Sequence, residues 1–135
     1  MLRELAARID PTTPCIFQLS GGTTGIPKLI PRTHDDYVLN ARLCAQAAGF
    51  DSGTVFLALL PLGHNYNLAS PGMLGVFLHG GTLVIGQGTD AKRVFPLIEQ
   101  HGVSVVAAAV PLITQWLDSD VPARHDLLTG SLDFL

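Results

Sequence analysis

The spacing of apolar residues changes several times along the chain, and each change predicts a new strand or helix. Short, mostly apolar runs predict strands at residues 15–19, 29–30, 55–60, 82–85 and 103–109. Helical spacing of apolar residues predicts helices from Thr33 to Gly49 and at residues 68–78, 91–100 and 112–118. Residues 132–135 alternate apolar and polar side chains, which predicts a further strand. Strands and helices therefore alternate along the chain.

Residues that start or stop helices support these boundaries. Thr33 precedes Asp36 by three positions, which is the spacing of a capping box. Gly49 and Gly102 each follow the last apolar residue of a predicted helix, where a left-handed residue commonly ends the helix. Pro111 stands just before the last predicted helix, a position that proline favours. These signals favour helices over loops at the same places.

The predicted strands are apolar on both faces, which is typical of strands buried between two layers of helices. We therefore expect an α/β fold with a mainly parallel sheet and helices on both faces. The strand at residues 15–19 is expected to be buried like the others. Ligands of such sheets bind beyond the carboxyl ends of strands, which here means the loops that begin at Ser20 and Pro61.

Composition changes the picture of the domain. Apolar residues make up 47 % of the 135 residues, and charged residues make up only 14 %, against a usual charged share of roughly 25 %. So few charges cannot cover the surface of a small globule. We expect residues 1–135 to form a single incomplete domain that is part of a larger one.

Charge and hydropathy exclude several classes of partner. The net charge is −3, and the 8 Lys and Arg residues are scattered, with only Lys92 and Arg93 adjacent, so no basic stripe is present to bind a nucleic acid. The longest uncharged stretch, residues 52–89, is interrupted by Pro, Asn and Gly, so no membrane span is predicted. The N-terminus has no apolar secretory segment, and Cys15 and Cys44 form no disulfide framework. We expect a cytoplasmic protein without nucleic-acid or membrane partners.

A loop rich in glycine and hydroxyl groups follows the first predicted strand. Its sequence is Ser20-Gly21-Gly22-Thr23-Thr24-Gly25-Ile26-Pro27-Lys28. Glycines let backbone N–H groups approach a phosphate chain, the hydroxyls donate hydrogen bonds, and the lysine supplies positive charge. The loop is not a Walker A motif, because that spacing requires Gly where Pro27 stands. Its chemistry favours a phosphate cradle over a simple surface turn.

The stretch from Leu19 to Lys28 resembles the phosphate-loop motif of the adenylate-forming superfamily. Two further segments narrow the resemblance to the aryl-acid AMP ligases of siderophore biosynthesis, such as 2,3-dihydroxybenzoate-AMP ligases. These segments are Leu29-Ile30-Pro31-Arg32-Thr33-His34-Asp35-Asp36-Tyr37 and Leu60-Pro61-Leu62-Gly63-His64-Asn65-Tyr66-Asn67-Leu68-Ala69-Ser70-Pro71-Gly72. The resemblance covers nearly the whole chain and implies that it is an internal part of the large N-terminal domain of such an enzyme.

The resemblance implies that an aromatic carboxylate attacks the α-phosphorus of ATP, which brings Mg²⁺ with it. Pyrophosphate leaves, and the phosphopantetheine thiol of an aryl carrier protein then takes up the acyl group. Such a displacement is catalysed mainly by positioning and charge neutralisation. The implied contacts to the β- and γ-phosphates come from Ser20, Gly21, Gly22, Thr23, Thr24, Gly25 and Lys28. His64 and Lys28 are the implied catalytic residues, with a ring N–H of His64 reaching an α-phosphate oxygen.

The same resemblance implies an acyl pocket made by Asn65, Tyr66 and Ser70. Asn65 would bond an ortho hydroxyl of the aryl acid, and the Tyr66 ring would stack on its face. Members that use 2,3-dihydroxybenzoate have Ser at the position of Ser70, and members that use salicylate often have Cys. 2,3-Dihydroxybenzoate is therefore the favoured substrate and salicylate the alternative. The family usually has Pro where this chain has Asn67.

Other functions remain open or are excluded on the residues. Residues 86–91 fit G-x-G-x-x-A, so a dinucleotide-binding module is an alternative, but the acidic residue expected after the next strand is missing. His79-Gly80-Gly81 resembles an esterase oxyanion turn, but no G-x-S-x-G elbow accompanies it. The five histidines are too widely spaced to predict a metal site. A further alternative is that the chain is a non-catalytic structural piece. The adenine-binding, ribose-binding and C-terminal lysine segments of the family are not found in it, so the chain alone is expected to be inactive.

Overall fold

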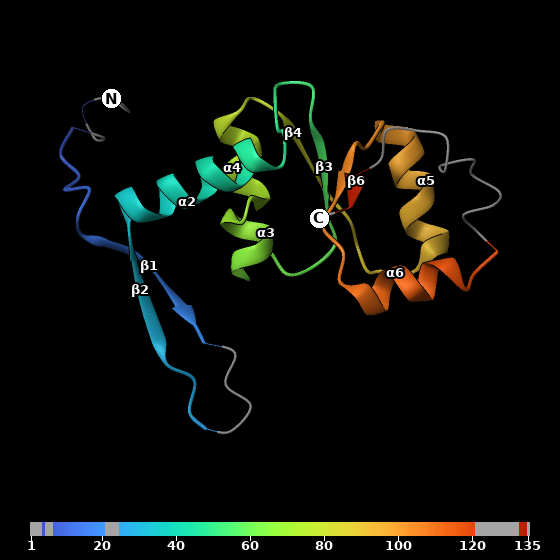
Figure 1. Ribbon diagram of the computed structural model, residues 1–135, viewed down its shortest axis with the longest axis horizontal. Helices are drawn as coiled ribbons and strands as arrows, with labels where there is room; N and C mark the ends of the chain where they lie inside the picture. Colours follow the sequence, from blue (N-terminus) through green and yellow to red (C-terminus); the bar gives the residue numbers. More distant parts are fainter. Residues whose placement is uncertain (1–3, 5–6, 21–24, 121–132, 135) are drawn as a thin grey trace.

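The computed structural model describes residues 4, 7–20, 25–120 and 133–134. Within these residues the strands form two separate sheets, a two-stranded hairpin and a four-stranded sheet (Figure 1). The hairpin pairs β1 (Pro14–Leu19) antiparallel with β2 (Leu29–Thr33). It extends away from the rest of the molecule.

The four-stranded sheet is parallel throughout and confirms the predicted α/β class. Its order is β4 (Thr82–Ile85), β3 (Val55–Ala58), β5 (Val105–Val106) and β6 (Asp133–Phe134). Register pairs Phe56 of β3 with Leu83 on one side and Val105 on the other. The predicted terminal strand is confirmed at residues 133–134, which pair with β5; residues 132 and 135 lie outside the described residues.

Alternation along the central strands builds a hydrophobic core on each face of the sheet. Successive side chains of a strand point to opposite faces. The helices that cover the sheet are α2 (His34–Ala47), α3 (Asn65–Ala69), α4 (Gly72–Leu78), α5 (Ala91–His101) and α6 (Val110–Leu117). Phe56 and Ala58 enter a core on the side of α2 and α4, whereas Leu57 and Leu59 enter a core with α5 and α6. Figure 1 shows α2, α3 and α4 on one side of the strands and α5 and α6 on the other. The strands are apolar on both faces because both faces are covered.

Thr33 and Gly102 set helix ends where the sequence predicts them. The last helix instead begins at Val110, two residues before the predicted start, because Pro111 is accommodated in its first turn. The Thr33 side chain accepts the Asp36 N–H at the start of α2. Asp90 caps α5 in the same way, and Gly102 ends it in the left-handed conformation. No helix in the described part of the chain is long and apolar enough to cross a membrane.

The first strand departs from prediction in burial and in pairing. It was expected to be buried in the parallel sheet, but Phe17 and Leu19 are 57 % and 67 % exposed. The reason is that β1 pairs only with β2, so no helix layer covers its outer face. Ser20 therefore follows a strand of an antiparallel hairpin rather than a strand of the parallel sheet.

The segment after β3 also differs from prediction. A loop at residues 61–67 and one helix at 68–78 were expected, but helix α3 already begins at Asn65 and a second helix, α4, begins at Gly72. The break falls at the cis Ser70–Pro71 peptide, where proline has no N–H to continue the helix. Gly72 follows with a φ of 45°, and a Cβ there would lie 2.2 Å from the Asn67 carbonyl atoms. Strands β3 and β5 are shorter than the predicted ranges 55–60 and 103–109.

Candidate functional site

Ser20 and Lys28 close the base of the glycine-rich loop. The Ser20 N–H donates to the Lys28 carbonyl at 2.9 Å, and the Lys28 N–H donates to Ser20 Oγ at 2.9 Å. The Ser20 hydroxyl keeps its hydrogen for another acceptor. Gly25 and Lys28 are exposed to solvent. The predicted contacts Gly21, Gly22, Thr23 and Thr24 lie outside the described residues.

His64 is held at the start of α3 by a hydrogen bond to the helix backbone. It is the N-cap residue, and its Nδ1 accepts the Tyr66 N–H at 3.3 Å. A neutral imidazole that accepts at Nδ1 carries its hydrogen on Nε2. The ring therefore offers Nε2–H as a donor, which is what a contact to a phosphate oxygen requires.

A hollow of about 410 Å³ joins the hairpin to the His64 corner. Its lining residues come from β1 and from the segment after β3: Ile16, Phe17, Gln18, Leu19, Pro61, Gly63, His64 and Leu68. Leu19 is the residue before Ser20, so the strand that leads into the glycine-rich loop borders the same hollow as His64. The hollow thus joins Leu19, one residue before the loop, to His64, which stands 45 positions later in the sequence.

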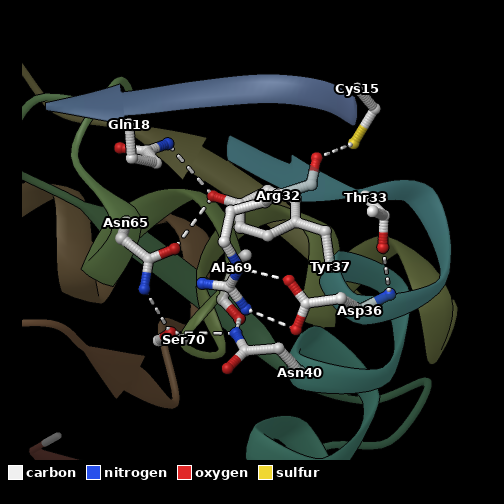
Figure 2. Close-up of polar contacts among 10 residues, drawn as sticks. All are labelled: Cys15, Gln18, Arg32, Thr33, Asp36, Tyr37, Asn40, Asn65, Ala69 and Ser70. Atoms are coloured by element: carbon white, nitrogen blue, oxygen red, sulfur yellow. Dashed lines mark hydrogen bonds and ion pairs between the residues drawn. The ribbon is translucent and has the colours of Figure 1, made fainter. Parts of the chain in front are cut away.

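Two of the three predicted acyl-pocket residues contact each other. The Asn65 Nδ2 donates to Ser70 Oγ at 2.8 Å, and both side chains are partly buried (Figure 2). Asn40 of α2 donates from its Nδ2 to Ser70 Oγ at 3.1 Å and to the Ala69 carbonyl at 2.7 Å. Hydrogen bonds from side-chain amides therefore hold residues 64–70, called the corner below, against α2.

Tyr37 connects this corner to the hairpin. Its hydroxyl donates to Asn65 Oδ1 at 2.9 Å and accepts from Gln18 Nε2 at 3.2 Å. The side chain is only 4 % exposed and packs against Ala41 and Ala69. Burial raises the pKa of the Tyr37 hydroxyl, so the hydroxyl is protonated and able to donate at neutral pH.

Arg32 covers the Tyr37 ring from the hairpin side. Its guanidinium carbon lies 5.1 Å from the ring centroid, within the range of a cation–π contact. The same guanidinium binds Asp36 through Nε and, at 3.0 Å, through Nη2, which holds the pKa of that carboxyl below its usual value. Tyr37 is therefore fixed by contacts on its ring as well as on its hydroxyl.

Tyr66, the third predicted pocket residue, lies differently from Asn65 and Ser70. Its ring is partly buried and packs against the core cluster on the α2 and α4 face of the sheet, and burial raises the pKa of its hydroxyl. Nothing in the described residues tests whether the ring also stacks on a ligand. The predicted role of Tyr66 stays a prediction.

Asn67 is fully buried in α3. Its Nδ2 donates to the Leu60 carbonyl at 2.6 Å, which ties the end of the β3 segment to the helix. Its Oδ1 has no partner among the described residues. The residue that departs from the family pattern is thus a buried clamp on the loop that carries His64.

The alternative dinucleotide site is disfavoured by charge. A hollow of about 510 Å³ lies at the N-terminus of α5, where a pyrophosphate would bind, and Asp90, Asp118 and Asp120 are among its lining residues. The Asp90 side chain already accepts the Lys92 N–H there at 2.9 Å. Carboxylates in this position repel an anion. Elsewhere in the described ranges, no three His, Cys, Asp or Glu side chains converge as a metal site would require.

Sequence reasoning missed Gln18, Tyr37 and Asn40. Tyr37 stands in one of the segments that carry the resemblance, but its hydroxyl has no predicted role there. A polar Asn40 one turn beyond it, on the same side of α2, was the available signal. Gln18 in an otherwise apolar strand was a second one.

A sequence profile of the family described as AMP-binding enzyme matches residues 3–134. The chain is 46 % identical over 129 residues to the vibriobactin-specific 2,3-dihydroxybenzoate-AMP ligase of Vibrio cholerae; the match covers 96 % of this chain and 23 % of that relative. It is 45 % identical over 124 residues to a Streptomyces protein named salicylyl-CoA synthase / salicylate adenylyltransferase, covering 88 % of this chain and 22 % of the relative.

Among solved structures, the apo structure of Mycobacterium smegmatis MbtA matches with a TM-score of 0.78 and 42 % identity, over 80 % of this chain and 20 % of that one. The chain thus spans less than a quarter of the length of these similar proteins. The profile covers almost every residue, and the fold agrees with it. The chain belongs to the AMP-binding enzyme family.

Proposed function

We propose that this chain is the phosphate-loop and acyl-pocket part of an aryl-acid AMP ligase. The complete enzyme activates an aromatic carboxylic acid with ATP, releases pyrophosphate and passes the aryl group to the thiol of a carrier protein. Relatives named for 2,3-dihydroxybenzoate and for salicylate chemistry, each at least 45 % identical to the chain, support this proposal. The observation that carries this proposal is that β1 and His64 border one hollow. Strand β1 leads into the loop that begins at Ser20.

Each group has a role that follows from its chemistry. Ser20, the loop backbone and Lys28 bind the β- and γ-phosphates of ATP, and bound Mg²⁺ supplies further neutralising charge. Nε2–H of His64 donates to an α-phosphate oxygen, where negative charge builds up as the carboxylate attacks. Asn65 and Ser70 bind ring oxygens of the aryl acid. In this proposal Mg²⁺ enters with ATP.

Ser70 favours 2,3-dihydroxybenzoate over salicylate. Its small hydroxyl can bond a 3-hydroxyl on the ring, which salicylate lacks. Siderophore biosynthesis in the cytoplasm is the setting we propose for this reaction. We also propose that residues 1–135 alone do not complete it, because the similar proteins are more than four times as long.

The test is ATP–pyrophosphate exchange by the full-length enzyme that contains this chain. We expect exchange with 2,3-dihydroxybenzoate, weaker exchange with salicylate and least with benzoate. His64→Gln removes the donor and is expected to slow exchange by about 100-fold, an effect typical of losing one transition-state hydrogen bond. His101→Gln, on the exposed end of α5, is the matched control and should leave the rate unchanged.

Two results would contradict the proposal. Exchange with none of the aryl acids would remove the activity itself. Equal rates for His64→Gln and His101→Gln would remove His64 from the site. Binding of NADH without binding of ATP would instead support the dinucleotide alternative.

A further inference from the structure

Four hydrogen-bonded side chains lead from the hairpin to the acyl pocket. Gln18 Nε2 donates to Tyr37 Oη, Tyr37 Oη donates to Asn65 Oδ1, and Asn65 Nδ2 donates to Ser70 Oγ (Figure 2). The distances are 3.2, 2.9 and 2.8 Å. Tyr37 and Asn65 each accept on one side and donate on the other, so the hydrogen bonds all point from Gln18 toward Ser70.

Asn40 fixes the far end of the series. Its Nδ2 has two hydrogens, and they go to the Ala69 carbonyl and to Ser70 Oγ. A carbonyl can only accept, so the Asn40 amide must present its nitrogen here. Ser70 Oγ thus accepts two N–H groups, one from Asn40 and one from Asn65, and its own hydrogen is left for a ligand.

Tyr37 fixes the near end. Because the Tyr37 hydroxyl accepts from Gln18, its single hydrogen is directed to Asn65 Oδ1. The Asn65 amide is then held with its nitrogen toward Ser70 and one N–H left over. The corner therefore offers a ligand an N–H donor and an O–H donor side by side.

We propose that Tyr37, held by Gln18, is a positioning residue that makes the acyl pocket selective for aryl acids with an oxygen next to the carboxylate. The inference rests on the proposed function. In such acids the ortho hydroxyl donates its hydrogen to its own carboxylate, so its oxygen presents lone pairs outward. The N–H of Asn65 is complementary to those lone pairs. An Asn65 amide rotated by half a turn would present its oxygen instead and would lose this preference.

The experiment measures, in the full-length enzyme, the ratio of kcat/KM for salicylate to kcat/KM for benzoate. Tyr37→Phe keeps the buried ring but removes the hydroxyl that orients Asn65. We expect the ratio to fall by about tenfold, the effect of one hydrogen bond of ordinary strength. The value for benzoate and the KM for ATP should change less than about twofold, since neither depends on the orientation of Asn65.

A pair of substitutions at Gln18 tests the direction of the series. Gln18→Glu places a carboxylate that can only accept, so it takes the Tyr37 hydrogen away from Asn65; we expect the ratio to fall as in Tyr37→Phe. Gln18→Met removes the donor but leaves Tyr37 free to donate to Asn65, and the ratio should stay within about threefold of the unchanged enzyme. Any effect of the new charge on ATP binding is common to both acids and cancels in the ratio.

The outcomes separate this inference from the proposed function. An unchanged ratio in Tyr37→Phe, with both acids slowed equally, would mean that Tyr37 is only structural and would overturn the inference while leaving the function intact. Equal ratios in Gln18→Glu and Gln18→Met would also overturn it, and they decide the matter if Tyr37→Phe does not fold. If the enzyme without substitutions activates no aryl acid, that result would contradict the proposed function and the inference together.

Discussion

Strand β1 of the hairpin and strand β3 of the parallel sheet are both mostly apolar but are stabilised in different ways. Phe56 in β3 is fully buried, whereas Phe17 in β1 is 57 % exposed. The parallel strands are covered by helices on both faces. The described residues of the hairpin have their mutual pairing and the contacts of Ile16, Gln18 and Arg32 with α2 and α3 residues. An apolar strand is therefore not by itself evidence of a buried strand.

The two regions meet at the candidate site. The sheet side supplies a fixed corner, with His64 capping α3 and Asn65 bonded to its neighbours. The hairpin side supplies the loop that begins at Ser20. The hollow lies between β1 of the hairpin and the segment that carries His64. A ligand bound there would contact the packed corner on one side and the more exposed strand β1 on the other. Loops positioned by a rigid scaffold commonly carry binding residues.

The largest expected effect comes from a matched pair of phenylalanines. Phe56→Ala opens a cavity in a packed core and should lower the free energy of unfolding by about 4 kcal/mol. Phe17→Ala removes a side chain that is already half exposed and should change it by less than about 0.5 kcal/mol. Urea denaturation of both variants checks this. Similar losses in the two variants would show that the hairpin is buried as deeply as the sheet.

A charge at Asn67 is expected to have the next largest effect. Asn67→Asp replaces the buried donor to the Leu60 carbonyl with a carboxylate, so the loop loses its clamp and gains an unpaired charge. We expect a loss of about 3 kcal/mol in unfolding free energy. The same amide-to-carboxylate change at exposed Gln87 is the control and should have little effect. A tolerated Asn67→Asp would mean that the site corner is open to solvent.

At the hairpin, by contrast, replacing a polar residue of the glycine-rich loop should change ATP binding more than it changes the stability of the protein. Ser20→Ala removes the acceptor of the Lys28 N–H and a donor to phosphate, so the KM for ATP should rise by about tenfold. Its melting temperature should remain close to that of Ser52→Ala, an exposed control. A large drop in melting temperature with unchanged KM would make Ser20 a structural residue.

The smallest expected effect is the acid dependence of the Arg32–Asp36 pair. Hydrogen bonding from Arg32 lowers the pKa of Asp36 below 3.8, so the pair stabilises the folded state above that pH. The contribution is lost as the pH falls through the lowered pKa. The difference in melting temperature between Asp36→Asn and the unchanged protein should therefore be small at neutral pH and vanish in strong acid. A difference that grows in acid would contradict the assignment.

The sequence predicted whether a segment is a helix or a strand better than it predicted the burial of that segment and its packing partners. The β3 and β5 strands, the Thr33 and Gly102 helix ends and the terminal strand follow from local patterns, and the structure has them. The exposure of β1 could not be predicted, because burial depends on which other elements pack against a strand. The early start of α3 was missed because a histidine N-cap is a weak signal beside Pro61 and Gly63.

The candidate site was predictable only in part. Motif resemblance predicts Ser20, Lys28, His64, Asn65 and Ser70 as site residues. It gives no role to Tyr37, whose hydroxyl acts across 28 positions of sequence. Hydrogen bonds between distant segments leave no periodic signal. The buried position of Asn67 was equally hidden, since only the departure from the family pattern marked it.

A crystal structure of the full-length enzyme with a hydrolysis-resistant salicyl adenylate analogue tests the central claim most directly. We predict the phosphate-side group beside His64 and the loop from Ser20 to Lys28, and the aryl ring beside Asn65 and Ser70. An analogue bound in the hollow at the N-terminus of α5, with the space between β1 and His64 empty, would contradict the account.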